Sequence, residues 1–264
     1  MLKLCVFGSG ISYTLSPIIH KAVLCELGVS AEYGVLDVSE SGFDAAVRRL
    51  LADLDGFNVT KPFKRAVIPY LSSVETGGLD AVNVVKINGG RATGYNTDAD
   101  GFAAALTELT GSVRGMKTLM IGAGGAAEAV AYALSRMGAD VAICNRTHEK
   151  AVRLAEKFGL RAVASAKDAG AAELIVNCAT PSSAPPLPED ADLGRVRYAY
   201  DLVYSPRTTR FMTACAEAGA KTSDGLGMLI YQAIIADEIF TGLKGDRAAL
   251  RKAAERALEK EGRI

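Results

Sequence analysis

The sequence predicts an α/β fold with a mostly parallel sheet, arranged as two domains. Short apolar runs alternate with helical patterns along nearly the whole chain of 264 residues, as in strands joined by crossover helices. With 49% apolar residues, a chain of this length can bury one large core or two modest ones. The turn-rich Thr110-Gly111-Ser112, which leads into a fresh strand at Lys117, predicts a domain boundary in the region 99–116.

In the first half, an apolar run predicts a strand at 3–7 that ends at two glycines, Gly8 and Gly10. Ser16-Pro17 predicts the N-cap and first residue of a helix at 17–27, because serine caps helices and proline suits their first turn. The same patterns then predict strand 32–37, helix 43–51 and strand 56–60, which Pro62 ends. Asn83 lies between apolar residues in another strand, and Asn96 follows a further one.

The second half shows the same alternation. Helix 101–109 precedes strands at 118–121, 141–145, 174–177 and 198–202, with helices at 125–137 and 150–158. A last helix opens at Gly225 and Gly227, and places Met228 and Gln232 four residues apart on one face.

Charge and cysteine usage narrow the classes of function. The chain carries 30 basic and 30 acidic residues, whereas a nucleic-acid-binding protein normally has a basic surplus. Five scattered cysteines without a C-x-x-C pair indicate free thiols in a reducing cytosol. We see neither a signal peptide nor an apolar stretch of membrane-spanning length, so we expect a cytoplasmic protein that binds no membrane. Two histidines and no Cys/His cluster argue against a catalytic metal.

The strongest local unit is KTLMIGAGGAAEAVAYALSRMGADVAICNRTHEK, residues 117–150. A strand ends at Ile121, and Gly122-Ala123-Gly124-Gly125-Ala126 turns the chain into a long helix before a second strand. In such a unit, Gly122 allows the tight turn and Gly124 lets a pyrophosphate approach the backbone. The alternative is a turn that only permits close packing. The context favours a dinucleotide site here over Gly8-Ser9-Gly10, where Tyr13 stands in place of a third glycine.

The end of the second strand indicates which dinucleotide is bound. NAD-binding units usually place an acidic residue there, but this chain reads Asn145-Arg146-Thr147, with Lys150 one helical turn later. Arg146 can stack on adenine and contact a 2′-phosphate, to which Thr147 and Lys150 add a donor and a charge. We therefore expect NADP. The alternative is that Thr147 caps a helix and Lys150 is solvated.

Polar stretches interrupt the apolar frame of the first half. Thr14 and Ser16 lie two apart, so an extended backbone would point both hydroxyls to one side, beside a helix N-terminus that favours a carboxylate. An ordinary capped helix is the alternative. In GFNVTKPFK, Asn58 and Thr60 share one face of a strand end, and Lys64 follows on a loop that faces the ligand crevice or solvent.

Further polar residues follow later strands. Asn83 and Asp98 place an amide and a carboxylate close to apolar residues, where buried polar groups need partners. The alternatives are that Asn83 satisfies a turn and that Asp98 caps a helix. Tyr204 lies just past a strand end in DLVYSPRTT.

Together these stretches resemble the shikimate dehydrogenase family, in the same order and along nearly the whole chain. The family's S-x-S-P resembles Thr14-Leu15-Ser16-Pro17, and its N-V-T-x-P-x-K is Asn58-Val59-Thr60-Lys61-Pro62-Phe63-Lys64. Its A-x-N, N-T-D, G-A-G-G-A, N-R-T, D-x-x-Y-x-P-x-x-T and G-L-G-M-L-x-x-Q motifs match at Asn83, Asp98, Gly122, Arg146, Tyr204 and Gln232.

The resemblance implies a fold and a reaction. It implies an N-terminal α/β substrate domain over 1–98, completed by C-terminal helices in 228–264, and a Rossmann-type doubly wound NADP domain over 99–227. The active site would lie in the cleft between them. The implied reaction is the reversible NADP-dependent reduction of 3-dehydroshikimate to shikimate, on the route to chorismate and aromatic amino acids, by a monomer or homodimer.

The resemblance also implies roles for individual residues. Thr14, Ser16 and Tyr204 would hold the substrate carboxylate, while Lys64 and Asp98, which also bind substrate, would form the catalytic pair. No histidine occurs in these stretches, so Lys64 is the natural acid or base for the hydroxyl proton. The substrate hydroxyls would be bound by Asn58, Thr60, Asn83, Asp98 and Gln232. The cofactor would be bound by Gly122, Ala123, Gly124, Gly125, Ala126, Asn145, Arg146, Thr147, Lys150, Gly225 and Met228.

Several positions depart from the family pattern while the catalytic pair is kept. Glu128 stands where an arginine is common, so its charge is expected to weaken phosphate binding, and 177–183 only loosely resembles a stretch near the cofactor. A quinate, quinate/shikimate or aminoshikimate dehydrogenase remains an alternative, as does a non-catalytic nucleotide-binding regulatory relative. Four other positions differ from the family's serine, histidine, threonine and glycine: Thr14, Tyr13, Val84 and Ala99.

Overall fold

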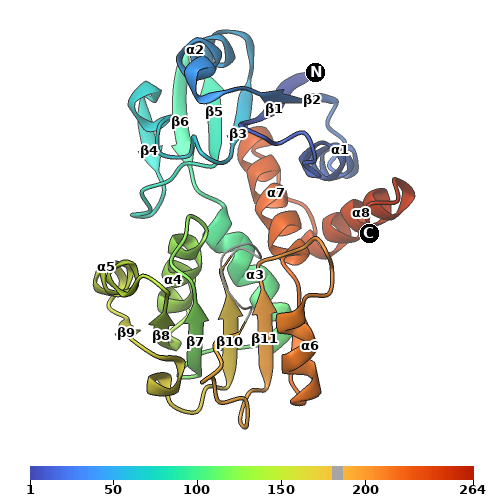
Figure 1. Cartoon of the computed structure of the whole chain (residues 1–264). Coiled ribbons are helices and arrows are strands. Elements are labelled where there is room, and N and C mark those ends of the chain that lie inside the picture. The colour runs from blue at the N-terminus through green and yellow to red at the C-terminus, as the bar shows by residue number, and fades with distance from the viewer. Residues whose placement is uncertain (180–186) are drawn as a thin grey trace. The chain divides into compact units, whose positions relative to one another are not determined.

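The computed structural model describes residues 1–179 and 187–264, and their contacts divide the chain into two compact units (Figure 1). Unit 1 comprises Met1–Thr97 and Ile230–Ile264, and unit 2 comprises Asp98–Leu229. The chain therefore leaves unit 1 after its first part and returns to it at the end. The assignment of the substrate to unit 1 and of NADP to unit 2 stays a prediction.

Unit 1 contains a sheet of six strands in the order β2-β1-β3-β5-β6-β4. β1 pairs in parallel with β2 and β3, whereas β5 runs antiparallel to both β3 and β6. The mostly parallel arrangement expected from the sequence therefore holds for this sheet, with β5 as its antiparallel strand. The strands are β1 (Leu2–Gly8), β2 (Ala31–Asp37), β3 (Gly56–Val59), β4 (Ser73–Glu75), β5 (Val84–Asn88) and β6 (Arg91–Tyr95).

A tight turn between β5 and β6 accounts for the antiparallel step. Asn88 pairs with Arg91 across the two strands, and Gly89 and Gly90 between them have φ values of 56° and 77°. Two successive residues with positive φ form the two-residue hairpin turn that matches the twist of paired strands. The chain therefore reverses at once, without the long crossover that a parallel pair requires.

Both faces of β1 are buried, which explains its continuous apolar sequence. On one face, the Phe7 ring stacks on Phe43 and Phe63 at centroid distances of 5.7 and 4.9 Å. On the other face, Leu4 and Val6 cluster with Ala236 and Phe240 from the end of the chain. The helices of the chain that contribute to unit 1 are α1 (Ser16–Glu26), α2 (Phe43–Asp53), the later part of α7 (Leu226–Thr241) and α8 (Arg247–Lys260).

The end of α7 and helix α8 pack closely against the first part of unit 1. A Cβ at Gly56 in β3 would lie 2.7 Å from Cε1 of Phe240, so only glycine leaves room for this ring. Lys86 Nζ donates to the carbonyl oxygen of Ile239 at 2.7 Å, near the C-terminus of α7, where cations are favoured. Helix α8 then packs against α1.

Unit 2 contains a fully parallel sheet in the order β12-β11-β10-β7-β8-β9. The chain starts in the middle at β7, builds outward to β9, and then returns to β10 to build the other half. This is the predicted Rossmann-type doubly wound order, and β7 and β10 flank its switch point. The strands are β7 (Lys117–Ile121), β8 (Asp140–Cys144), β9 (Arg161–Val163), β10 (Leu174–Asn177), β11 (Tyr198–Asp201) and β12 (Lys221–Ser223).

The crossover helices of unit 2 cover this sheet. Helix α3 packs against α4 and against β11 and β12, whereas α6 also contacts β11 and β12. A cluster that includes Leu119, Ile175, Ala199 and Phe211 forms part of the core. The helices are α3 (Asp98–Thr110), α4 (Ala127–Arg136), α5 (His148–Phe158) and α6 (Arg210–Glu217). In the described ranges, 1–179 and 187–264, no helix has the length and apolarity needed to cross a bilayer.

The start of α1 corrects one sequence prediction. Ser16 was expected as N-cap, but it is the first helical residue, and Leu15 is the N-cap with helical φ and ψ of −87° and −9°. The backbone N–H groups of Ile18 and Ile19 both donate to the Leu15 carbonyl, so helical hydrogen bonding begins one residue earlier. Helix α4 begins later than predicted, at Ala127 and not at residue 125, because the glycine turn continues through Ala126.

The five cysteines are free thiols with very different environments, which predicts selective labelling. Burial raises the pKa of Cys5 to about 12 and of Cys215 to about 11, and it also raises the pKa of Cys144 and Cys178. Thiolates are the reactive form, so iodoacetamide at pH 8 should label the exposed Cys25 first in the folded protein. Mass spectrometry of tryptic peptides measures this, with urea-unfolded protein as the fully labelled control. Equal labelling of Cys5 and Cys25 would contradict it.

Candidate active site

The N-terminal glycine loop is occupied by a carboxylate of the same chain. The backbone N–H groups of Gly10 and Ile11 donate to the two carboxylate oxygens of Asp37 at 2.7 and 2.8 Å. A Cβ at Gly8 would lie 2.5 Å from Cγ2 of Thr60, which gives this glycine a packing role. The amides that a phosphate would need are therefore already bonded, so this loop does not serve as a phosphate site.

The hydroxyls of Thr14 and Ser16 lie together, as expected, but a turn brings them there. Thr14 Oγ1 donates to Ser16 Oγ at 3.0 Å, and the Ser16 backbone N–H donates to Thr14 Oγ1 at 3.2 Å. The intervening Leu15 is helical, so the predicted extended backbone is wrong. The result is a pair of hydroxyls at the N-terminus of α1, where a negative charge is stabilised.

A cluster of amides, two buried and one half-buried, lies beside β3 and β5. The Asn83 side chain accepts from the Thr97 N–H at 2.8 Å and donates to Thr97 Oγ1 at 3.0 Å. It also donates to Oε1 of Gln232 at 3.4 Å, and the Asn58 amide donates to the Asn83 carbonyl at 3.5 Å. Three of the predicted hydroxyl-binding residues, Asn58, Asn83 and Gln232, are thus joined in one network although 149 positions separate Asn83 from Gln232.

The remaining polar residues of the prediction lie at the ends of elements. Thr60 follows β3, and the half-buried Lys64 is anchored through its carbonyl, which accepts from the Val82 N–H at 2.9 Å. In unit 2, Asp98 is the first residue of α3, and Tyr204 follows β11 after a short gap. Each of these side chains is half-buried.

A pocket of about 550 Å³ opens in unit 2 around the glycine turn after β7. It lies beside the switch point between β7 and β10, where doubly wound sheets bind ligands. Nine of the predicted cofactor residues line it: Gly122, Ala123, Gly124, Gly125, Ala126, Asn145, Arg146, Thr147 and Lys150. The pocket therefore unites the turn after β7 with the loop after β8.

The glycines of this turn have different roles. Gly122 has a φ of 102°, and a Cβ there would lie 2.9 Å from the Ala179 nitrogen, so both conformation and packing require glycine. A Cβ at Gly124 or Gly125 would meet nothing within 4 Å. Packing among the described residues therefore does not require glycine at either position. Their open backbone suits close approach by a phosphate group.

The side chain of Asn145 connects the two loops that line the pocket. Its Oδ1 accepts from the Ala123 N–H at 3.1 Å, and its Nδ2 donates to the Thr147 carbonyl at 2.8 Å. Thr147 occupies the N-cap position of α5, but its side chain makes no capping hydrogen bond, contrary to the capping alternative. Arg146, Thr147 and Lys150 are exposed, and Arg146 and Lys150 bring positive charge to the pocket.

Glu128 has a partner that lessens its expected effect on phosphate binding. Lys157 Nζ lies 2.7 Å from Glu128 Oε1, and the Glu128 side chain is only 11% exposed. The ammonium beside the carboxylate opposes the negative charge that the sequence placed near the turn.

Two predicted cofactor residues do not line the pocket. A Cβ at Gly225 would lie 2.1 Å from the Leu202 carbonyl oxygen, so backbone packing requires this glycine. The Met228 N–H donates to the hydroxyl of the buried Tyr200 at 3.3 Å. Of the predicted stretch 177–183, residues 180–183 lie outside the described residues.

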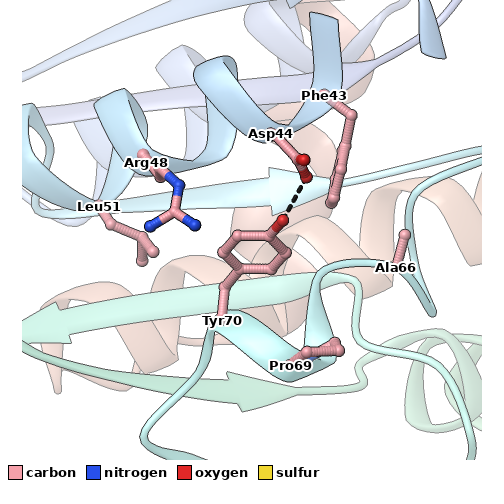
Figure 2. A pocket seen from close by; sticks show the side chains of 7 residues that line it. All are labelled: Phe43, Asp44, Arg48, Leu51, Ala66, Pro69 and Tyr70. Atoms are coloured by element: carbon pink, nitrogen blue, oxygen red, sulfur yellow. Dashed lines mark hydrogen bonds between the residues drawn. The ribbon is translucent and has the colours of Figure 1, made fainter. Parts of the chain in front are cut away.

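A second surface pocket, over α2 in unit 1, contains none of the predicted site residues (Figure 2). The Tyr70 hydroxyl donates to the Asp44 carboxylate, and the Arg48 guanidinium carbon lies 5.5 Å from the centre of the Tyr70 ring. Its principal polar groups thus contact one another, and we assign no function to it.

Comparisons with known proteins identify the family. Models described as the shikimate dehydrogenase substrate binding domain, shikimate / quinate 5-dehydrogenase and the shikimate 5′-dehydrogenase C-terminal domain match residues 6–85, 104–190 and 225–255. Shikimate dehydrogenase (NADP(+)) of a Thermus thermophilus strain is 39% identical over 264 aligned positions, which cover 98% of this chain and 99% of the relative. The chain belongs to the shikimate dehydrogenase family.

Solved structures in and near the shikimate dehydrogenase family share this fold. Shikimate 5-dehydrogenase from Thermus thermophilus, in complex with NADP(H) and shikimate, matches with a TM-score of 0.84 and 36% identity, covering 98% of this chain and all of that chain. Quinate dehydrogenase from Corynebacterium glutamicum, in complex with NAD, matches with a TM-score of 0.84 and 28% identity, covering 96% of this chain and 98% of that chain.

In this shikimate dehydrogenase family member, the sequence prediction missed the far wall of the unit 2 pocket. Ser165, Pro188 and Asp190 line it, and the Ser165 hydroxyl donates to the Asp190 carboxylate. This hydrogen bond lowers the pKa of Asp190. The position of Ser165 could have predicted its place in the pocket. It follows the edge strand β9, and loops after neighbouring parallel strands meet at one edge of the sheet.

The bridging role of Asn145 predicts a local effect on backbone protection. In Asn145→Ala, the Ala123 N–H loses its acceptor, so its hydrogen exchange should become roughly fivefold faster, as for the loss of about 1 kcal/mol. Amide exchange by NMR measures this. Asn145→Asp is the matched control, since it keeps the acceptor and should keep Ala123 protected. Unchanged exchange in the alanine variant would contradict the bridge.

Proposed function

We propose that this chain is an NADP-dependent shikimate dehydrogenase, which interconverts shikimate and 3-dehydroshikimate by hydride transfer. The observation that carries the proposal is the presence in one chain of a pocket around a glycine turn, with an arginine after β8, and of a cluster of three amides of which two are buried. Amides suit a ring that carries several hydroxyls, since each can both donate and accept. The full-length identity of 39% to an enzyme named for this reaction supports it.

The substrate groups are assigned by chemical type. Thr14, Ser16 and Tyr204 bind the substrate carboxylate, and the hydroxyl pair at the N-terminus of α1 supports this, because it offers donors and a favourable dipole without a net charge. Asn58, Thr60, Asn83, Asp98 and Gln232 bind the hydroxyls. Burial of Asn58 and Asn83 supports specific recognition, since buried donors discriminate against a ligand that leaves them unpaired.

Lys64 and Asp98 act as the catalytic pair. In the direction of shikimate oxidation, the hydroxyl proton passes to the Lys64 amine as the carbonyl forms, and the Asp98 carboxylate stabilises the resulting ammonium. In the reverse direction, Lys64 returns this proton to the carbonyl oxygen. The anchored backbone of Lys64 supports this role, because a general acid must be held in a fixed position.

The unit 2 pocket fits NADP, and its residues bind separate parts of it. When bound, NADP supplies the acceptor for the hydride that leaves the substrate carbon. The backbone from Gly122 to Ala126 receives the pyrophosphate, as the open positions of Gly124 and Gly125 indicate. Arg146, Thr147 and Lys150 bind the 2′-phosphate, Asn145 holds their loop, and Gly225 and Met228 complete the site.

We place this reaction in the biosynthesis of chorismate and aromatic amino acids, in the cytoplasm, with a monomer or homodimer as the active species. The free state of all five cysteines supports a reducing compartment.

A second candidate is oxidation of quinate. The likeness to quinate dehydrogenase in complex with NAD favours it, as does the replacement of a serine by Thr14 at the carboxylate site. The residues after β8 favour NADP-dependent shikimate dehydrogenase instead, because Arg146 and Lys150 can neutralise a 2′-phosphate that NAD lacks.

Initial rates from nicotinamide absorbance test the proposed function. Shikimate and quinate are each offered with NADP and with NAD, and we expect turnover chiefly with shikimate and NADP. Comparable or faster turnover of quinate would favour the second candidate. The absence of turnover with every pair, in protein whose folding is checked by circular dichroism, would overturn an enzymatic role and favour a regulatory one.

The assignment of Lys64 predicts a separation of kcat from KM. Lys64→Ala should lower kcat by about 10²–10⁴-fold with little change in the KM for shikimate, because a proton acceptor is lost in the transition state. Steady-state kinetics measure both constants. Lys61→Ala, an exposed lysine on the same loop, is the matched control and should retain kcat. A large rise in KM at constant kcat would instead assign Lys64 to binding.

A further inference from the structure

A buried chain of polar side chains runs from the end of α7 to the amide cluster of unit 1. His20 Nδ1 lies 2.7 Å from Asp237 Oδ1, and both side chains have no exposed surface. The His20 ring stacks on Tyr33 with a centroid distance of 4.3 Å and an interplanar angle of 11°. The Tyr33 hydroxyl donates to Asn58 Oδ1 at 2.7 Å.

Two neighbours of Asn58 determine which way its amide faces. The Tyr33 hydroxyl meets the oxygen, and the Asn83 carbonyl lies 3.5 Å from the nitrogen. In the flipped orientation, the Asn58 oxygen would face the Asn83 carbonyl oxygen, and two acceptors without a proton between them repel. The Asn83 carbonyl therefore sets the orientation, and the Tyr33 hydroxyl, by donating to the oxygen, holds the amide in it with its NH₂ group available as a donor.

We infer that Tyr33 is a positioning residue for the substrate, which acts by holding the Asn58 amide with its NH₂ group toward a substrate hydroxyl oxygen. The inference rests on the proposed function, because it assumes that Asn58 meets a hydroxylated ring. Tyr33 itself lies in β2, is 4% exposed and belongs to a core cluster, and the inference gives it no direct contact with the substrate.

The surroundings of Tyr33 keep it in this role. Burial raises its pKa well above the ordinary value, and the nearby Asp237 carboxylate raises it further, so the hydroxyl stays protonated as a donor. The stacked His20 ring, held through Nδ1 by Asp237, supports one face of the phenol. A phenylalanine at this position would keep the stacking and leave the Asn58 oxygen without its donor.

Tyr33→Phe tests the inference through substrate binding. The KM for shikimate should rise about tenfold, and the KM for NADP should stay within about twofold, because the NADP site lies in the other unit. Val47→Ala is the control for a loss of stability alone, since Val47 is fully buried in α2 of the same unit and outside the polar chain. Val47→Ala should lower Tm at least as much as Tyr33→Phe does, while its KM for shikimate stays at the wild-type value.

A double variant tests whether Tyr33 acts through Asn58. If it does, Tyr33→Phe combined with Asn58→Ala should raise the KM no further than Asn58→Ala alone. Multiplicative effects of the two substitutions would overturn the inference. So would a KM in Tyr33→Phe within twofold of the wild type, or an equal rise of KM in Val47→Ala.

The wild type separates failure of the inference from failure of the proposed function. Turnover of quinate alone would refute the proposed substrate, and the same comparison of KM with quinate would still decide the role of Tyr33. An NMR measurement needs no turnover at all. The side-chain NH₂ signals of Asn58 should be sharp in the wild type and broadened or doubled in Tyr33→Phe, and unchanged signals would overturn the inference.

Discussion

Hydrogen bonds between buried polar side chains control much of the organisation of unit 1. Asn83 uses both atoms of its amide within the chain, bonding Thr97 at 2.8 and 3.0 Å, and so ties the start of β5 to the end of β6. Hydrogen bonds also join Asn58 to Tyr33 and His20 to Asp237. Because an unpaired buried polar atom costs about 1–3 kcal/mol, the groups proposed to meet the substrate cannot be arranged independently of those behind them. The proposed recognition of substrate and the folding of unit 1 therefore depend on shared hydrogen bonds.

The two glycine turns have similar backbones, and the charged side chains near each turn determine its role. Each follows the first strand of its sheet, where backbone N–H groups collect and favour an anion. In unit 1 the anion is the carboxylate of Asp37, which meets the N–H groups of Gly10 and Ile11. In unit 2 the loop after β8 carries Arg146, and Gly124 and Gly125 remain open. One turn is thereby an internal structural contact, and the other is available to a nucleotide.

Local patterns predicted most of unit 2 and only part of unit 1. The strand, glycine turn and helix around Gly122 are close in sequence, so periodicity and spacing were sufficient for their order and for most of the pocket. The direction of β5 was missed although Asn88-Gly89-Gly90 is a hairpin signal. The prediction of Ser16 as the N-cap of α1 was wrong, because the first helical hydrogen bonds are accepted by the carbonyl of Leu15. The pairing of His20 with Asp237 joins residues 217 positions apart, and no local pattern reports such a contact.

The route of the chain has a consequence for the order in which the protein forms during synthesis. Residues 98–229 are continuous in sequence, so unit 2 holds all of its own strands once that stretch has left the ribosome. Unit 1 lacks Ala236 and Phe240 from its core, and α8 beside α1, until the last part of the chain emerges. Residues 1–97 are thus made before residues 98–229, but their unit is completed after unit 2. Gly56, whose missing side chain leaves room for Phe240, can make this contact only after residue 240 has been synthesised.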